Sequence, residues 1–133
     1  MTIKPQDVLV IIKVLSSGWP RTYADLAHSL FISPSEAHAS TKRLVAAGLL
    51  QSFPVMTVNR KAVEEFFIHG LKYVFPAVRG PRTRGIPTSY AAPPLIDKFT
   101  IGDEDIPVWP DPEGSRQGYE LKPLYPSVPK IAK

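Results

Sequence analysis

Apolar residues are densely spaced at the start of the chain. Between Pro5 and Ser17 most positions are apolar, which suits either a buried strand or a buried helix. A length of about thirteen residues, a proline in the first turn and Gly18 just past the end favour the helix. Because apolar side chains cover nearly its whole circumference, we expect a second subunit to bury the side that its own domain leaves open.

Two capped helices are predicted next. Residues 22–31 open with Thr22 as the cap and Asp25 three residues later, and their apolar residues share one face. Residues 33–36 read Ser-Pro-Ser-Glu, which provides a serine cap, a proline at the first helical position and a glutamate that can reach back to the cap. This helix is predicted to end at Gly48, because glycine suits the left-handed position after a helix.

A hairpin and a last helix complete this part of the chain. Residues 49–58 are β-prone with Pro54 in the middle, so we expect two short strands with a turn near the proline. Asn59 can then cap a helix whose apolar positions recur at helical spacing as far as Phe75. The predicted fold class is α+β, mainly α.

The order and the local sequences of these elements resemble a known DNA-binding fold. The matching stretches are residues 22–27 (Thr-Tyr-Ala-Asp-Leu-Ala), 33–38 (Ser-Pro-Ser-Glu-Ala-His) and 42–50 (Lys-Arg-Leu-Val-Ala-Ala-Gly-Leu-Leu). On these residues, the stretch 5–75 resembles the winged helix-turn-helix domain and, within it, the MarR-like bacterial transcriptional regulators. The resemblance implies that residues 33–48 form a recognition helix and that the partner is double-stranded DNA.

A recognition helix enters the major groove with its first turns against base edges. Ser35 and His38 offer donors or acceptors one turn apart, and Ala39 is small enough for close approach. Lys42 can reach a guanine edge or a phosphate. We therefore expect the start of this helix, from its cap Ser33, to contact the bases.

Other residues are expected to hold the DNA backbone. Arg21 and Arg43 would bind phosphates without reading sequence, and the free amides at the Thr22 helix start can bind one too. Arg60 and Lys61 lie in the first turn of a helix, where the dipole disfavours cations, which suggests a nearby phosphate. Two solvated side chains are an equal alternative for this last pair.

The second part of the chain differs in composition. Of 15 prolines, four lie in the first 75 residues and eleven lie between Pro76 and Pro129. Since proline cannot donate to a helix or a sheet ladder, we expect a domain at residues 1–75 and a largely irregular tail at residues 76–133. Interleaved aromatic residues indicate that the tail packs on the domain or on a partner.

Charge also changes along the chain. Residues 1–96 hold 11 Lys and Arg against 5 Asp and Glu, whereas residues 97–133 hold 5 against 7. Six of these seven acidic residues form an acidic stretch: Asp97, Asp103, Glu104, Asp105, Asp111 and Glu113. Arg82 and Arg84, on a stretch expected to be flexible, can enter a DNA minor groove; a solvated linker or an intrachain clamp for the acidic residues are the alternatives.

Several classes of function are not expected. The chain has no cysteine, and its three histidines fall on three different predicted helices without an i, i+4 partner, so we expect no metal site. It has no phosphate-binding glycine loop and no nucleophile elbow, so we expect no cofactor and no enzyme activity. The longest apolar run is far short of a membrane span, and no signal peptide is recognisable, which predicts a cytoplasmic protein without a membrane partner.

Two functions remain from the sequence. The first is a sequence-specific DNA-binding regulator, most simply a repressor, acting as a homodimer through the first helix or the helix after Asn59. The second is a protein-interaction adaptor, or an antitoxin-like regulator whose acidic, aromatic tail binds a partner protein. Trp109 and Tyr119 are the candidate anchors for that partner, although packing within its own chain is the alternative for Trp109.

Overall fold

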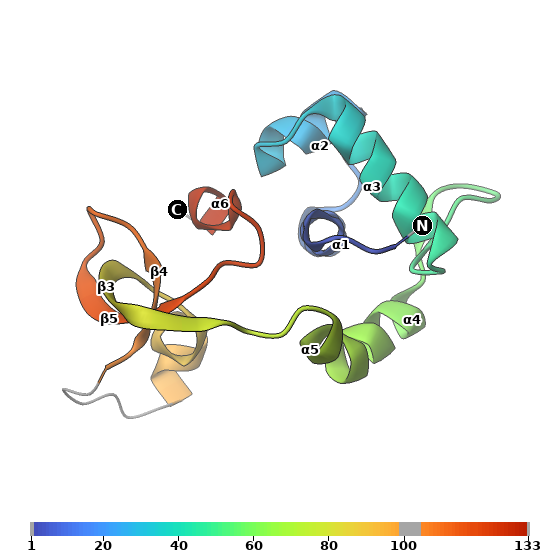
Figure 1. Cartoon of the computed structure of the whole chain (residues 1–133). Helices are drawn as coiled ribbons and strands as arrows, with labels where there is room; N and C mark the ends of the chain where they lie inside the picture. The colour runs from blue at the N-terminus through green and yellow to red at the C-terminus, as the bar shows by residue number, and fades with distance from the viewer. Residues whose placement is uncertain (1, 99–104, 133) are drawn as a thin grey trace. The chain divides into compact units, whose positions relative to one another are not determined.

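The computed structural model has an α+β fold that divides into two compact units (Figure 1). It describes residues 2–98 and 105–132, so Asp103 and Glu104 of the predicted acidic stretch lie outside the described residues. The N-terminal unit comprises Met1–Pro76 together with Leu124–Lys133, and the inserted unit comprises Ala77–Pro123. The N-terminal unit is therefore made from two separate stretches of sequence.

The first helix, α1, spans Pro5–Ser17, as the sequence predicts. Its apolar side chains are buried by other elements of the same unit, chiefly α2 and α3. This corrects the argument that a second subunit is needed to cover the helix. Among the larger apolar side chains of α1, Ile12 is exposed.

Helices α2 (Tyr23–Leu30) and α3 (Pro34–Ala46) begin at the predicted caps. The Asp25 amide donates to Thr22 Oγ1 over 3.0 Å, and the Glu36 amide donates to Ser33 Oγ over 3.1 Å. The Ser33 amide donates in return to Glu36 Oε1 over 3.1 Å, which completes the predicted capping box. Gly48 follows α3 with a φ of +82°, the left-handed conformation expected there.

The hairpin and the helix after it also form, with one interruption. Strands β1 (Leu50–Gln51) and β2 (Thr57–Val58) pair antiparallel. The Asn59 side chain caps α4 (Arg60–Glu65), which continues through a π-helical turn, η1 (Phe66–Gly70), into α5 (Leu71–Val74). The single helix predicted here therefore contains one widened turn, which the apolar spacing does not reveal.

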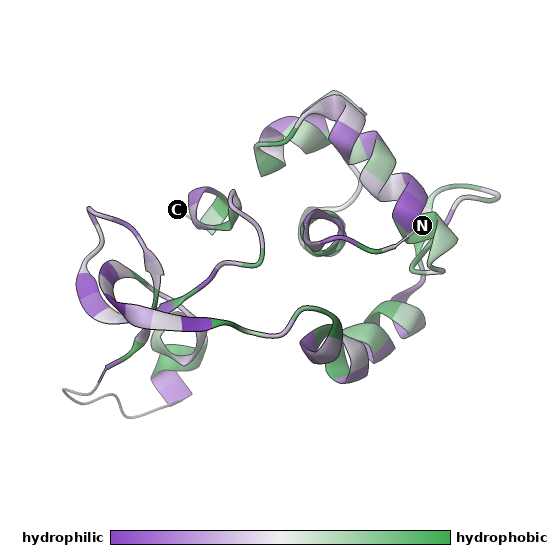
Figure 2. Cartoon of the chain, in the orientation of Figure 1, coloured by the Kyte–Doolittle hydropathy of each residue, from purple (hydrophilic) through white to green (hydrophobic). Residues whose placement is uncertain are grey.

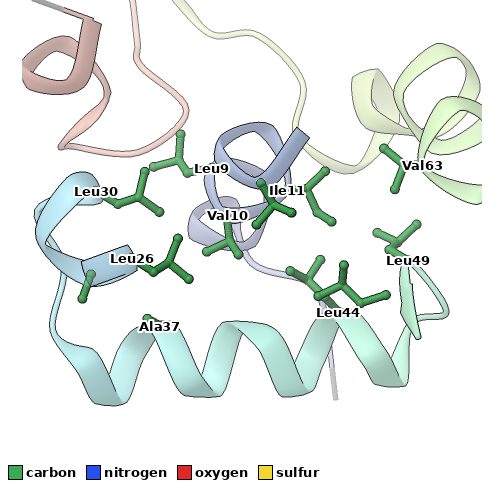
Figure 3. Close-up of a cluster of buried hydrophobic side chains, with 12 residues drawn as sticks. Leu9, Val10, Ile11, Leu26, Leu30, Ala37, Leu44, Leu49 and Val63 are labelled. Carbon is green, nitrogen blue, oxygen red and sulfur yellow. The ribbon is translucent and has the colours of Figure 1, made fainter. Parts of the chain in front are cut away.

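The core of the N-terminal unit surrounds α1. Figure 1 shows α1 end-on between α2 and α3 on one side and α4 and α5 on the other. Leu26, Leu44 and Val63 reach α1 from three different elements (Figure 3). Residues 124–132, here called the returning segment, add Tyr125, Val128 and Ile131 to this core, and their helix α6 (Val128–Ala132) contacts α2.

The inserted unit contains a small β-barrel, which corrects the prediction of a largely irregular tail. Strand β3 (Arg79–Pro87) pairs antiparallel with both β4 (Pro107–Pro110) and β5 (Arg116–Leu121), and these two pair with each other in parallel. Short 3₁₀ turns follow β3 at Ser89–Ala91 and Leu95–Lys98. The core of this unit is formed by Ala91, Ile106 and Val108.

Glycine allows the three strands to approach so closely. A β-carbon on Gly85 would meet the carbonyl oxygen of Trp109, and one on Gly118 would meet the carbonyl oxygen of Ile106. The barrel thus depends on backbone contacts that no other residue type permits at these two positions.

Within the described part of the chain, no helix is both long enough and apolar enough to cross a bilayer.

Candidate nucleic-acid interface

Helix α3 has a buried face and an open face. Ala37, Ser40 and Leu44 are buried beneath it, whereas Ser35, His38 and Lys42 are exposed. Ala39 is half-buried at the edge of the open face. The helix therefore presents short polar groups over its first turns and a lysine one turn further along, as the sequence predicts.

The cap residues are occupied by helix capping. Besides its bond to the Glu36 amide, Ser33 Oγ lies 3.1 Å from Ser35 Oγ, and Thr22 Oγ1 accepts from Asp25. Their side chains consequently fix the start of each helix. A phosphate at these positions would be bound by backbone amides rather than by the two hydroxyl groups.

One side of the α3 face adjoins α2 and the hairpin. The rings of Tyr23 and His38 meet edge to face, with centroids 4.9 Å apart. A hollow beside them is lined by Tyr23, Lys42, Val45 and the hairpin residues Ser52 and Met56. His38 is thus held by an aromatic neighbour while it remains exposed.

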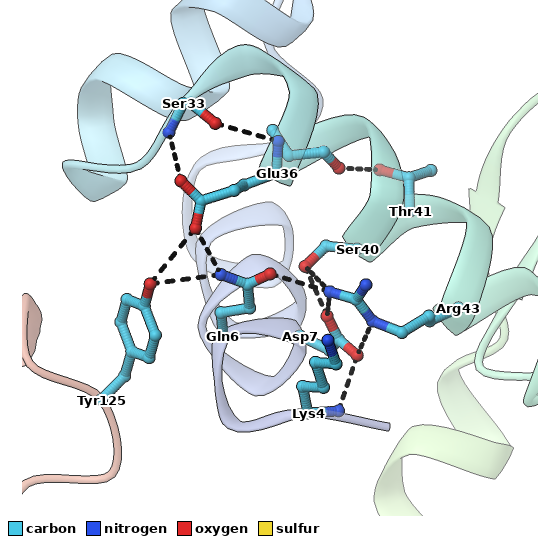
Figure 4. Close-up of polar contacts among 10 residues, drawn as sticks. Lys4, Gln6, Asp7, Ser33, Glu36, Ser40, Thr41, Arg43 and Tyr125 are labelled. Carbon is cyan, nitrogen blue, oxygen red and sulfur yellow. Dashed lines mark hydrogen bonds and ion pairs between the residues drawn. The ribbon is translucent and has the colours of Figure 1, made fainter. Parts of the chain in front are cut away.

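Arg43 is the clearest correction to the predicted site. Its Nε and Nη2 atoms donate to the two carboxylate oxygens of Asp7, each over 2.8 Å, and Nη2 also donates to Gln6 Oε1 (Figure 4). The side chains of Arg43 and Asp7 are 12% and 0% exposed. Hydrogen bonds from Arg43 to this buried carboxylate raise the pKa of the arginine, which stays charged. It therefore joins α3 to α1 instead of extending towards a phosphate.

Asp7 makes this arrangement necessary. Its buried carboxylate also accepts hydrogen bonds from Ser40 Oγ and from the backbone amide of Lys4. Burial of a carboxylate without such partners would lower the stability of the fold. The guanidinium of Arg43 therefore lies against Asp7 rather than in solvent. The sequence carries a signal that predicts this need: an aspartate inside a helix that is apolar on nearly all sides.

The returning segment covers the other side of α3. Gln6 Nε2 donates to Glu36 Oε2 over 3.0 Å and to Tyr125 Oη over 3.2 Å, and Tyr125 Oη lies 3.4 Å from the same carboxylate oxygen (Figure 4). The backbone amide of Ser33, followed by the Gln6 side chain, holds the pKa of Glu36 below its usual value. Ser35, Ala39 and the segment from Leu124 to Pro126 line a hollow here, so contact with Ala39 is restricted to its open side.

The N-terminal unit carries exposed cations outside α3. Arg21 precedes α2, and Arg60 and Lys61 lie exposed in the first turn of α4. Over its two sequence stretches this unit has 10 Lys and Arg against 5 Asp and Glu, a balance of +5. The inserted unit has 6 against 7, a balance of −1. The positive charge of the protein is therefore carried by the unit that contains α3.

The hairpin loop has an unexpected apolar tip. Phe53 is 88% exposed and Val55 is 64% exposed, and residues 50–58 contain no Lys or Arg. Sequence reasoning missed this feature, although an apolar Phe-Pro-Val turn between two short strands is itself a signal. The tip can contact another molecule through apolar surface but not through charge.

The remaining predicted residues lie in the inserted unit. Arg82 forms an ion pair with Asp105, and Arg84 Nη1 donates to the carbonyl oxygen of Gly114 over 3.2 Å. Trp109 and Tyr119 are half-buried on β4 and β5. The expectation of a flexible arginine arm is corrected, because these arginines project from a paired strand.

The described residues 2–98 and 105–132 contain no group of three His, Asp or Glu side chains arranged to hold a metal ion. Comparisons with models of protein families, with curated proteins and with solved structures found no match for this chain.

Proposed function

We propose that the N-terminal unit binds double-stranded DNA as a winged helix-turn-helix module, with α3 in the major groove. The observation that carries the proposal is the open face of α3, a capped helix with short polar side chains at its start. The unit that contains α3 has a formal charge of +5 from its Lys, Arg, Asp and Glu residues. A helix of this kind fits the major groove, and its first turns meet the base edges.

The proposed contacts are a revised form of the predicted set. Ser35 and His38 read base edges, and Lys42 reaches a guanine edge or a phosphate. Arg21, Arg60 and Lys61 bind the backbone and set the position of the helix. Arg43 is omitted, because its role is to hold α3 against α1.

The biological role that follows is a regulator of transcription in the bacterial cytoplasm, most simply a repressor that blocks a promoter. A homodimer would allow two α3 helices to meet successive major grooves about 34 Å apart. The better candidate for its interface is now the surface of η1 and α5, where Ile68, Tyr73 and Val74 are exposed.

The proposal is tested with DNA selected by the full-length protein from a random-sequence pool. The affinity of the selected duplex is measured by fluorescence anisotropy at several salt concentrations. Lys42→Ala is expected to weaken binding about tenfold and, where a phosphate contact is lost, to lower the salt slope by about 0.9. Lys98→Ala removes the same charge from an exposed turn of the inserted unit and is the matched control.

Two outcomes would contradict DNA binding by α3. One is a pool that yields no enriched duplex even at low salt. The other is an equal loss of affinity in the Lys42→Ala and Lys98→Ala variants, which would indicate general charge attraction.

A second candidate function rests on the apolar hairpin tip. Phe53 and Val55 suit a protein surface better than a phosphate backbone, which favours a docking module. Phe53→Ser separates the two functions, because it removes the apolar contact while the α3 face and its charges remain. If this variant keeps full affinity for the selected duplex, the tip is free to serve a protein partner.

A further inference from the structure

The outer face of the small barrel combines arginine and aromatic side chains. Residues directly opposite each other on paired strands share a face, and alternate residues along a strand share it too. The three pairs on this face are Arg82 with Tyr119, Arg84 with Gln117, and Ile86 with Trp109. The alternating positions Gly85, Val108 and Gly118 are buried on the inner side.

A third arginine extends this face. The guanidinium of Arg79 lies 3.9 Å from the centroid of the Tyr119 ring, and the Arg79 side chain is exposed. The two planar groups form a stack, with the guanidinium covering one face of the ring. Bases that are not paired in a duplex stack on such guanidinium and aromatic planes.

The arginines of this face retain hydrogen-bonding capacity. The ion pair between Arg82 and Asp105 is exposed, with side-chain exposures of 58% and 41%, so solvent weakens it. The guanidinium of Arg84 donates from Nη1 to the carbonyl oxygen of Gly114, and a guanidinium has five N–H donors. Both groups can therefore bind phosphate oxygens without breaking the barrel. Figure 2 shows purple and pale colours over the first part of β3, in contrast to the green of the residues before it.

We propose that this face binds single-stranded nucleic acid. Phosphates would lie at Arg82 and Arg84, one base on the Arg79–Tyr119 stack and another against Trp109. The face favours a single strand because a duplex keeps its base planes inside its own stack and offers only base edges. The inserted unit has a balance of −1, so its attraction for phosphate is local to this face.

This inference is independent of duplex binding by α3. It concerns the other unit, other residues and another form of nucleic acid. It applies equally to RNA and to single-stranded DNA, since both offer phosphates and unpaired bases.

The experiment uses the full chain and two fluorescein-labelled probes, oligouridylate RNA and oligothymidylate DNA. Each probe has about 12 nucleotides, a length within the range of about 4–16 that OB-fold domains cover. Affinity is measured by anisotropy over a range of salt concentrations. Tighter binding of one probe would identify which nucleic acid is preferred.

Three variants isolate the face. The double variant Arg82→Ala with Arg84→Ala is expected to weaken the binding of both probes about tenfold. It should also lower the slope of the salt dependence by about 1.4, or about 0.7 for each lost phosphate contact. Lys72→Ala with Lys98→Ala removes two exposed charges elsewhere and should leave both values unchanged. Arg79→Lys keeps the charge but loses the planar stack, so it should weaken binding with little change in salt slope.

Fluorescence gives a second readout. The chain has two tryptophans, Trp19 and Trp109, and Trp19→Phe leaves the barrel residue as the single tryptophan reporter. Saturating oligouridylate is expected to quench its emission through contact with a base. Circular dichroism of each variant checks that the fold is kept.

The proposal is overturned if the wild-type chain shows no saturable binding of either probe at low salt. It is also overturned if the paired lysine variant loses as much affinity as the paired arginine variant. Lys42→Ala must leave oligonucleotide binding unchanged; a loss there would assign the single strand to the α3 face instead.

Discussion

Asp7 and Arg43 show how one buried charge decides the role of another residue. The aspartate lies inside α1, where its carboxylate is fully buried, and the arginine on α3 supplies its counter-charge. Removing one member of a buried pair leaves the other charged and unpaired. The pair therefore fixes how α3 lies against α1, and with it the open face that we propose meets DNA.

Asp7→Ala is expected to lower the free energy of unfolding of the N-terminal unit by about 3 kcal/mol, because Arg43 is left without its partner. The measurement is urea denaturation followed by circular dichroism. Glu64→Ala, which removes an exposed carboxylate from α4, is the matched control and should change stability by less than about 0.5 kcal/mol. Similar values for the two variants would show that the pair does not hold the helices together.

Glu36 links stability to pH. Hydrogen bonds to its carboxylate, first from the Ser33 amide, lower its pKa in the folded state. The charged form is therefore favoured by folding, and its contribution is fully present above the unfolded pKa of about 4.3. That contribution is lost as the pH falls through the lower, folded pKa.

In the Glu36→Gln variant, the free energy of unfolding is accordingly expected to fall less than in the wild type when the pH is lowered. The free energy of unfolding is measured between neutral pH and about pH 3 for the variant and the wild type. Their difference should shrink as the pH falls through the lowered pKa of Glu36, because both side chains are uncharged below it. A difference that stays constant over this range would contradict the role given to the carboxylate.

The residues that the sequence predicts well act over short distances. Thr22 and Ser33 cap helices through amides three residues away, so their spacing alone is informative. Arg43 is not predictable in this way, because its partner lies 36 residues earlier in the chain. The helical pattern correctly places Arg43 at the flank of α3 but does not show that its guanidinium turns inward.

At the scale of whole elements, proline content was a misleading guide. Pro87, Pro107 and Pro110 lie at strand ends, and Pro81 lies where the register between β3 and β5 shifts. At such positions the lack of a backbone N–H donor in proline costs the sheet little stability. The barrel is assembled by strand pairs far apart in sequence, so the local composition of the chain gave no sign of it.

Gly118→Ala is expected to disrupt the barrel, because its new methyl group would meet the carbonyl oxygen of Ile106. The two units have separate cores, so amide signals of the inserted unit should collapse in a two-dimensional NMR spectrum while those of the N-terminal unit persist. Gln117→Ala, at the exposed neighbouring position of the same strand, is the control. Unchanged spectra for Gly118→Ala would mean that the strands can separate without loss of the fold.

At the scale of the whole molecule, the N-terminal unit depends on sequence that follows the inserted unit. Tyr125, Val128 and Ile131 of the returning segment pack against its core, and Tyr125 also bonds to Gln6. The chain therefore passes between the two units twice, once before and once after the inserted unit.

Truncation after Pro123 is expected to lower the stability of the N-terminal unit by about 3 kcal/mol, since three partly buried side chains are lost from its core. Thermal unfolding followed by circular dichroism measures the change. Lys130→Ala, which alters an exposed residue of the same segment, is the control. An unchanged melting temperature in the truncated protein would show that the segment only rests on the surface.

The divided N-terminal unit also has a consequence for protein synthesis. A ribosome completes α1 to α5 well before it adds the residues that close their core, and the intervening 47 residues of Ala77–Pro123 take on the order of several seconds to translate. During that delay the nascent helices display apolar surface that chaperones can recognise. The N-terminal unit can therefore close its core only after the inserted unit has been translated.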